Sequence, residues 1–157
     1  TVTLPDLFDG QSADNYDAAF ALRKEVGTGA IMERAGAAIG AAPPEAVLSG
    51  VSFGASLIGE FWTDRPKMAG ALLFAGITDW MEPPMPGLPV SVHIAHPDPF
   101  DDEDYFADWV AQKGEADLQM HRYDGAGHYF LDPSLDDYNE AAAKLCLDRS
   151  REFLKSL

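Results

Sequence analysis

The chain has 157 residues, 46% of them hydrophobic, which is enough for one domain with a buried core over residues 1–157 and argues against disorder. Acidic residues number 26 against 11 Lys and Arg, which gives a net charge of −15. A field of this sign repels phosphate backbones and anionic lipids, so we expect no nucleic-acid or membrane partner. The single cysteine, Cys146, allows no intramolecular disulfide and fits a reducing compartment, so we expect a cytoplasmic protein.

Extended and helical segments alternate in the first half of the chain. A short strand over 2–4 precedes an Ala-rich helical stretch from about 15 to 39, which Gly27 and Gly29 would split. A second strand over 46–49 leads into a helix over 53–62 that is apolar on nearly every side and is therefore expected to be buried. The run 68–75 is continuously apolar, as in a parallel strand that is covered on both faces.

The second half continues the alternation. We expect a strand over 90–95, a helix from about 101 to 113 that opens on acidic residues, a strand over 118–123, and a final helix capped by Asp136 or Asp137. The final helix carries apolar residues at helical spacing, namely Tyr138, Ala142, Leu145, Cys146, Phe153 and Leu157. The pattern predicts an α/β fold with a mostly parallel sheet and helices on both faces. Such sheets bind ligands at the carboxyl ends of their strands.

The segment Gly50-Val51-Ser52-Phe53-Gly54 has the form G-x-S-x-G and lies between a predicted strand and a predicted helix. A serine that stands clear at so sharp a turn takes strained backbone angles, and flanking glycines let the chain pass close by. This context predicts that Ser52 is a nucleophile and that the N–H of Phe53 is an oxyanion donor. The alternative is a Gly-rich turn whose serine only caps the helix.

A serine hydroxyl is a weak nucleophile and needs a general base. His128 lies in a Gly-containing loop after the last strand, from which its imidazole could lean toward Ser52, and His96 is the alternative base. Asp98 follows the strand over 90–95 and could orient the base. The chain order of nucleophile, acid and base is the order that α/β-hydrolases use.

Other patterns are less specific. A metal site on His93, His96 and Asp98 is disfavoured, because the two histidines would face opposite sides of an extended strand. We expect neither a metal nor a cofactor. Four residues flank the proposed site and are candidates for an apolar substrate pocket, with ordinary packing as the alternative: Trp80, Met81, Tyr129 and Phe130.

Several stretches together have a familiar form: Leu-Pro-Asp-Leu-Phe-Asp-Gly at 4–10, the segment 50–54, His-Pro-Asp-Pro-Phe at 96–100, and the segment 123–130. Over essentially its whole length the chain resembles the dienelactone hydrolase family, a small branch of the α/β-hydrolases. The resemblance implies Ser52 as nucleophile, Asp98 as acid and His128 as base. The enzymes that give the family its name use cysteine as nucleophile, so a broader esterase or lactonase is expected here.

The resemblance also implies that relatives have a segment of about thirty residues before the equivalent of Thr1. In them this segment supplies a central strand, which would lie between the strands ending at Leu4 and Ser49, and the loop with the second oxyanion donor. We therefore expect an N-terminally incomplete α/β-hydrolase domain.

These observations favour a serine hydrolase that cleaves small carboxylic esters or lactones through an acyl-enzyme on Ser52. The expected partner is a small-molecule substrate, and a homo-oligomer is compatible with the sequence. One alternative is a catalytically incomplete scaffold that acts as a binding or interaction module. Another is a thioesterase or peptidase with the same three residues, because substrate choice depends on pocket shape.

Overall fold

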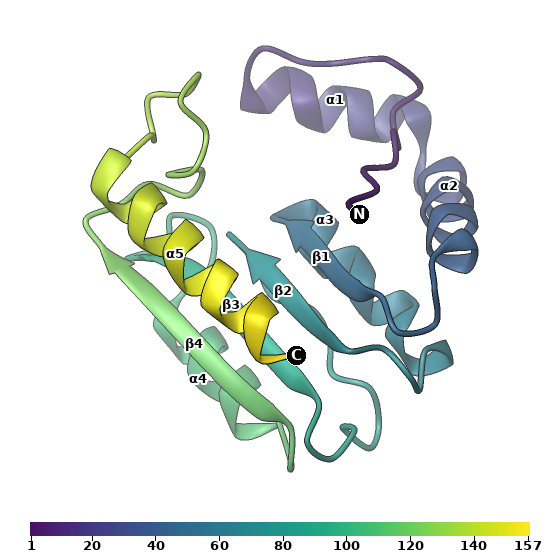
Figure 1. Ribbon diagram of the computed structural model, residues 1–157. Coiled ribbons are helices and arrows are strands. Elements are labelled where there is room, and N and C mark those ends of the chain that lie inside the picture. Colours follow the sequence, from purple (N-terminus) through teal and green to yellow (C-terminus); the bar gives the residue numbers. More distant parts are fainter. The chain divides into compact units, whose positions relative to one another are not determined.

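The computed structural model describes all residues from Thr1 to Leu157. The chain forms two compact units, Thr1–Pro43 and Pro44–Leu157, and each is described by itself (Figure 1). The expectation of one domain over residues 1–157 stays a prediction. None of the helices combines the length and the apolar character that crossing a bilayer would need.

The first unit contains two helices, α1 (Tyr16–Val26) and α2 (Thr28–Ala41). The Asn15 side chain caps α1 by accepting a hydrogen bond from the N–H of Ala18 at 2.9 Å. Gly27 separates the helices with a φ of +82°, a left-handed conformation that glycine adopts without a Cβ penalty. The predicted break in the Ala-rich stretch is therefore confirmed at Gly27.

The predicted strand over 2–4 is wrong, because residues 1–14 form neither a helix nor a strand. The sheet consists of four later segments, so no neighbour pairs with 2–4, and Val2 and Leu4 are each 93% exposed. A local turn shapes the segment instead. The Asp6 carboxylate accepts hydrogen bonds from the N–H groups of Phe8 and Gly10.

The second unit contains a parallel sheet in the order β1-β2-β3-β4, which confirms the predicted fold class. Its strands are β1 (Val47–Val51), β2 (Gly70–Phe74), β3 (Pro89–His96) and β4 (Asp117–Asp124). The two central strands are buried along nearly their whole length, whereas β4 at the edge is largely half-exposed. The continuous apolar run that predicted β2 therefore reflects its central position.

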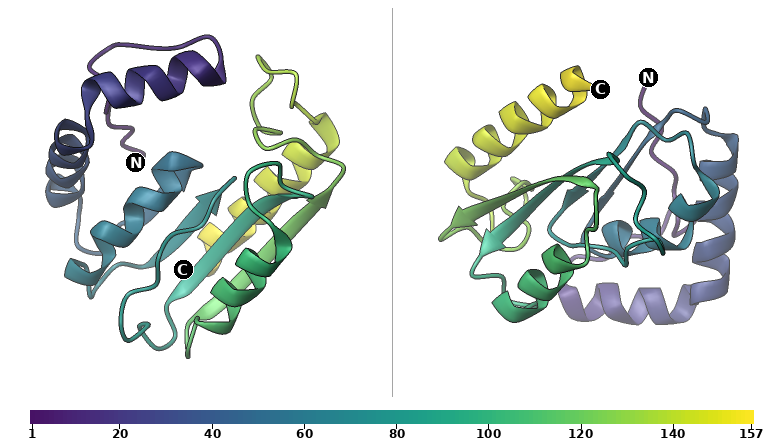
Figure 2. Two further views of the ribbon diagram at one scale, coloured as in Figure 1. Left: turned by 180° about the vertical axis from the view of Figure 1, so that it is seen from behind. Right: turned by 90° about the horizontal axis from the view of Figure 1, so that it is seen from below.

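Helices α4 (Glu103–Ala111) and α5 (Glu140–Ser156) lie on opposite faces of this sheet (Figure 2).

The helix predicted over 53–62 is much shorter. It consists of α3 (Phe53–Ser56) followed by 3₁₀ turns over Leu57–Glu60 and Trp62–Asp64.

A threonine outside the helix explains its early end. The Thr78 hydroxyl donates to the carbonyl of Ser56 at 3.0 Å and accepts from the N–H of Gly59 at 2.6 Å. These backbone groups would otherwise be available for bonding within a continuous helix. The side chain thus takes over hydrogen bonds at the point where α3 stops.

The start of α5 also differs from the prediction. Asn139 caps the helix by accepting from the N–H of Ala142, whereas the Asp137 carboxylate accepts from the N–H of Tyr129 in a loop. The buried face of α5 is made by Ala143, Cys146, Ser150 and Phe153. Three of the apolar residues expected on that face are 40–46% exposed, namely Tyr138, Leu145 and Leu157.

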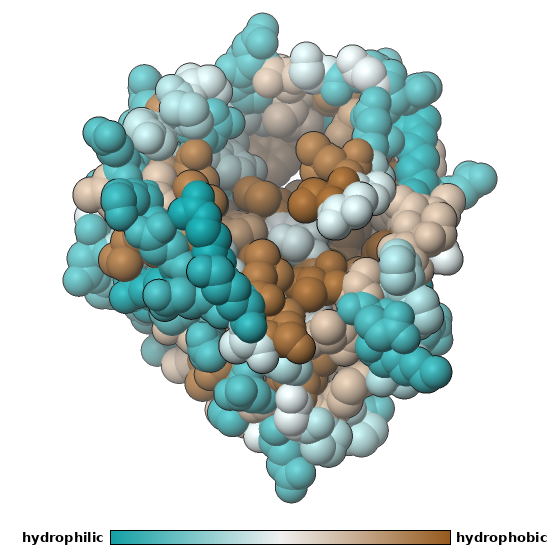
Figure 3. Space-filling view, viewed as in Figure 1, coloured by the Kyte–Doolittle hydropathy of each residue, from teal (hydrophilic) through white to brown (hydrophobic).

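Two groups of side chains pack together in this unit. Tyr123, Ala126, Phe130 and Cys146 form one buried cluster. The other is a stack of three indoles, with Trp80 between Trp62 and Trp109 at ring-centroid distances of 5.6 and 4.6 Å. The outer side of α5 is hydrophilic in Figure 3, but Leu147 and Leu154, seven residues apart, remain 45% and 48% exposed.

Candidate active site

Ser52 lies at the carboxyl end of β1, directly before α3. Its φ of 51° and ψ of −116° place a non-glycine residue in a sparsely populated region, which costs about 1–3 kcal/mol. Its N–H donates to the carbonyl of Phe74 on the neighbouring strand at 2.7 Å. Backbone strain of this kind is typical of functional sites whose surroundings hold the residue in place.

Two glycines make room for this turn. A Cβ on Gly50 would lie 2.3 Å from the carbonyl carbon of Gly54, and a Cβ on Gly76 would lie 3.0 Å from the carbonyl oxygen of Ser52. Gly54 itself has open space, since a Cβ there would meet nothing within 4 Å. The steric reason given for the glycine pattern therefore applies to Gly50 and not to Gly54, and Gly76 is a position that the motif did not reveal.

His128 is buried, with only 4% of its surface exposed, and each of its ring nitrogens has a polar partner. Its Nε2 lies 2.9 Å from Ser52 Oγ, and its Nδ1 lies 2.9 Å from Asp98 Oδ2. A carboxylate only accepts hydrogen bonds, so Nδ1 carries the proton and, in the neutral ring, Nε2 accepts from the Ser52 hydroxyl. The structure thus brings hydroxyl, imidazole and carboxylate together from three different loops.

Asp98 follows the end of β3, and its side chain is 1% exposed. The other carboxylate oxygen, Oδ1, accepts from the N–H of Phe100 at 3.0 Å. Burial raises the pKa of the Asp98 carboxyl, but the hydrogen bonds from His128 and the Phe100 N–H outweigh burial and hold this pKa below its usual value. Asp98 is therefore ionised at neutral pH, as a group that stabilises an imidazolium must be.

The loop that carries His128 is held on both sides. A Cβ on Gly127 would lie 2.7 Å from the Asp137 carboxyl carbon, so this close approach requires glycine. The rings of Phe100 and Tyr129 contact the imidazole edge-to-face, at centroid distances of 4.6 and 4.7 Å. Sequence reasoning assigned no such contact to Phe100 or Asp137, and only the position of Phe100 two residues after Asp98 offered a clue.

His96, the alternative base, is oriented toward other groups. Its Nδ1 lies 2.6 Å from Asp124 Oδ1 and its Nε2 lies 3.9 Å from Glu103 Oε1. His93 is fully buried in β3 and bonds to hydroxyl groups, so the two histidines of the considered metal pattern have separate partners. No group of three or more His, Cys, Asp or Glu side chains is arranged to hold a metal ion.

The four pocket candidates have different surroundings. Tyr129 contacts the imidazole of His128, as described above. Trp80 belongs to the indole stack and donates to the carbonyl of Trp109, and Met81 is 8% exposed. Phe130 is fully buried in the core cluster, which leaves it no surface to line an open pocket. The pocket roles of Tyr129, Trp80 and Met81 stay predictions, as does the oxyanion role of the Phe53 N–H.

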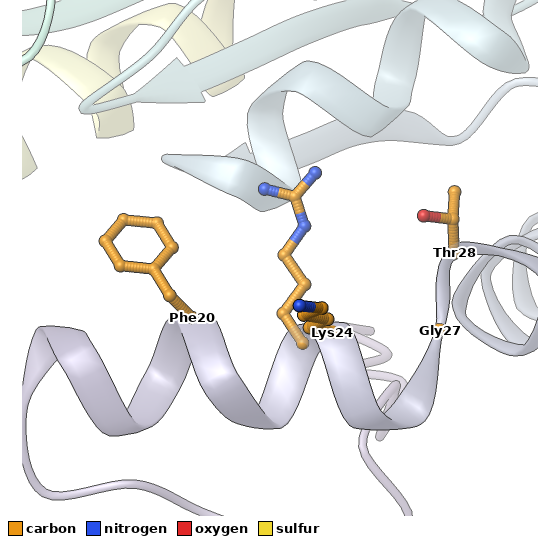
Figure 4. A pocket seen from close by; sticks show the side chains of 5 residues that line it. Phe20, Lys24, Gly27 and Thr28 are labelled. Carbon is orange, nitrogen blue, oxygen red and sulfur yellow. The ribbon is translucent and has the colours of Figure 1, made fainter.

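Each of the two units contains a hollow. In the first unit, a hollow of about 300 Å³ is lined by Phe20, Arg23, Lys24, Gly27 and Thr28, where α1 meets α2 (Figure 4). A second hollow of about 240 Å³ lies between β4 and α5, with His121 and Arg149 in its lining. None of the residues predicted for the site lines either hollow.

A comparison with family models decides the relationship. The model of the dienelactone hydrolase family matches residues 1–157. The chain belongs to the dienelactone hydrolase family. Family membership supports a hydrolase, in agreement with the sequence interpretation. A comparison with curated proteins gave no significant match.

Solved structures of this family share the fold. A candidate dienelactone hydrolase from Klebsiella pneumoniae is 14% identical with a TM-score of 0.72, and the match covers 98% of this chain and 74% of that one. A dienelactone hydrolase-like promiscuous phosphotriesterase from metagenomic libraries is 19% identical with a TM-score of 0.65, over 94% and 70% of the two chains. At these sequence identities the structural similarity shows a shared fold and nothing about function.

Proposed function

We propose that this member of the dienelactone hydrolase family is a serine hydrolase that cleaves small carboxylic esters or lactones. The observation that supports it is the continuous line of hydrogen bonds from Ser52 Oγ through His128 to Asp98, with both distances at 2.9 Å. A buried imidazole between a hydroxyl and a carboxylate is the arrangement that activates a serine for acyl transfer.

In the first half of the reaction, Ser52 Oγ attacks the substrate carbonyl carbon while His128 Nε2 takes the hydroxyl proton. The carbonyl oxygen becomes an oxyanion, and the N–H of Phe53 donates to it. Asp98 stabilises the imidazolium that forms. The intermediate then expels the alcohol oxygen, which receives the proton from His128, and the acyl group remains on Ser52.

In the second half, His128 takes a proton from water, and the resulting hydroxide attacks the acyl carbon. Collapse of this intermediate releases the carboxylic acid and returns the proton to Ser52 Oγ. Every proton transfer uses His128 Nε2, so the scheme needs only protein groups and water. With a lactone, the alcohol and the acyl group are parts of one molecule, so the acyl-enzyme keeps both.

A fluorophosphonate probe tests the proposal at the level of the nucleophile. We expect labelling of the protein, and its loss in Ser52→Ala. Ser134→Ala is the matched control, because Ser134 is an exposed serine that bonds to a carboxylate, Asp132, without a histidine. Labelling that persists in Ser52→Ala, or no labelling of folded protein, contradicts the proposal, and the latter result favours the binding-scaffold alternative.

The substrate class is tested separately with esters, lactones, thioesters and peptides of matched acyl length. We expect turnover of carboxylic esters and lactones. The mass added to Ser52 distinguishes these two, since a lactone adds its whole mass and an ester adds only its acyl part. Turnover confined to thioesters or peptides would replace the proposed substrate class while keeping the nucleophile.

A further inference from the structure

Four charged or polar side chains form one connected group beside the candidate site. This rim cluster consists of His96, Glu103, Arg122 and Asp124. His96 Nδ1 donates to Asp124 Oδ1 at 2.6 Å, and its Nε2 lies 3.9 Å from Glu103 Oε1. Both Arg122 Nη atoms donate to the Glu103 carboxylate at 2.6 Å, and Nη2 also donates to the carbonyl of Ala95 at 2.8 Å.

The rim cluster lies at both ends of the loop that carries Asp98. His96 is the last residue of β3, directly before loop 97–102, and Glu103 is the first residue of α4, directly after it. His96 bonds to Asp124 at the end of β4, and Glu103 bonds to Arg122 within β4. The loop is therefore fixed at its start and at its end to one neighbouring strand.

The same strand leads to the loop that carries His128. Asp124 is the last residue of β4 and is the register partner of His96 across the parallel pair. The N–H of Gly125 donates to the carbonyl of His96 at 2.8 Å, so the two loops also share a backbone bond where they begin. His128 follows four residues after Asp124. The rim cluster therefore connects the supports of both members of the Asp98–His128 pair.

We propose that the rim cluster positions Asp98 against His128, and that Arg122 and Glu103 are positioning residues for the reaction proposed above, on which this inference rests. Neither is assigned contact with the substrate. The 2.9 Å bond between His128 Nδ1 and Asp98 Oδ2 depends on where two separate loops place their side chains. A misplacement of about 1 Å in such a pair can lower the rate by about 10²-fold.

The Arg122–Glu103 pair has the features that distinguish a rigid pair from an ordinary surface ion pair. The Arg122 side chain is only 23% exposed, whereas that of Glu103 is 50% exposed. The Arg122 guanidinium makes a two-pronged contact with the Glu103 carboxylate and lies 4.7 Å above the ring of Phe106. The hydrogen bond from Arg122 lowers the pKa of the Glu103 carboxyl, which keeps the pair charged. By contrast, the Lys144–Asp148 pair on α5 is 79% and 46% exposed and makes one contact at 2.7 Å.

The inference is tested by Glu103→Gln and Arg122→Gln, each in the wild-type and in the Asp98→Asn background. In the wild-type background we expect kcat to fall about 10- to 100-fold while KM for an activated ester changes less than about twofold. In the Asp98→Asn background the same changes should lower kcat less than about twofold, because the contact that they support is already lost. Arg122→Lys should fall between Arg122→Gln and wild type, since it keeps the charge without the fork.

Thermal unfolding of each variant, and assays well below its Tm, distinguish a displaced Asp98 from an unfolded protein. Asp148→Asn is the matched control for removal of an acidic partner and should change neither kcat nor KM. Equal losses of kcat in both backgrounds, or no loss in the wild-type background, would overturn the inference.

A proton NMR readout does not depend on activity. The Nδ1 proton of His128 should give a downfield signal in wild type that weakens or shifts upfield in Glu103→Gln, and an unchanged signal would contradict the inference. Failure of the proposed function would look different, because folded wild-type protein would then show no turnover, or a turnover that survives Ser52→Ala, whatever the rim cluster does.

Discussion

Two buried histidines in the second unit, the proposed general base His128 and His93, differ in the partners of their ring nitrogens. His93 in the middle of β3 is fully buried, and its ring nitrogens lie 2.7 Å from the Tyr123 hydroxyl and 3.1 Å from Ser91 Oγ. His128 is nearly as buried, but one of its partners is the carboxylate of Asp98. Burial and hydrogen bonding are common to both, so the charge of the partner makes the difference.

The two environments therefore differ in whether they tolerate a positive charge on the imidazole. Burial lowers the pKa of His93 to about 3, helped by the nearby His121 and Arg149, so this ring is neutral at neutral pH. Around His128, the ionised Asp98 can balance the positive charge that proton transfer creates. The first environment is suited to packing and the second to moving a proton.

The comparison is tested most strongly by removing the charge beside His128. Asp98→Asn leaves a neutral neighbour, as His93 has, and an amide that donates to Nδ1 would favour the tautomer with the proton on Nε2. We expect kcat to fall by about 10⁴-fold with little change in fold, as for the equivalent change in serine proteases. Steady-state kinetics with an activated ester and a circular dichroism spectrum measure this, and a loss under tenfold would contradict the assigned role.

The next largest effect concerns the backbone that presents Ser52. Gly50→Ala places a Cβ 2.3 Å from a backbone carbon, so the turn must shift, and we expect a loss of about 3 kcal/mol in the free energy of unfolding together with most of the activity. Gly54→Ala is the control, because its Cβ meets nothing, and its stability should stay within about 1 kcal/mol of wild type. Urea unfolding measures the free energy of unfolding of both variants. Equal losses of stability in Gly50→Ala and Gly54→Ala would show that the close approach at Gly50 does not matter.

A smaller effect is expected at the structural histidine. Because the pKa of His93 is about 3 in the folded protein, below the ordinary histidine value of 6.5, the unfolded chain binds an extra proton between these pH values. His93 therefore lowers stability as the pH falls below about 6.5, by up to about 1.4 kcal/mol per pH unit. The pH dependence of urea unfolding should be less steep in His93→Gln by up to this amount, and identical slopes would contradict the neutral, buried state of His93.

The smallest expected effect is at the lone thiol. Cys146 is fully buried on α5, and burial raises the pKa of its thiol to about 11. A thiol reagent should therefore react about 10²-fold or more slowly with native protein than with protein unfolded in urea, and hydrolase activity should survive the incubation. Rapid labelling of the native protein would show that this part of the core opens more readily than the structure indicates.

Much of the second unit could be predicted because its signals are local. The apolar run before Ser52 and the alternation of strands and helices depend on few residues, and they gave the four strands of the sheet and the loops that carry Ser52, Asp98 and His128. The strand over 2–4 failed because an extended apolar segment becomes a strand only if a neighbour pairs with it. The pattern of the segment itself contains no information about that neighbour.

The remaining differences depend on residues distant in sequence. Thr78 takes hydrogen bonds at the end of α3, and Asp137 binds the N–H of Tyr129 while Asn139 caps α5. The pairing of Arg122 with Glu103 has the same character. Such contacts depend on tertiary placement, so a motif can locate the residues that we propose to react without revealing the groups that hold them in position.

Rapid quenching of the reaction with an activated ester, followed by mass analysis of the intact protein and of its peptides, shows directly whether Ser52 becomes acylated. We expect an acyl group that appears within the first turnover on the peptide containing Ser52, remains detectable during turnover, and is absent in Ser52→Ala. Turnover without any covalent adduct, or an adduct on a different residue, would contradict a mechanism in which Ser52 is the nucleophile.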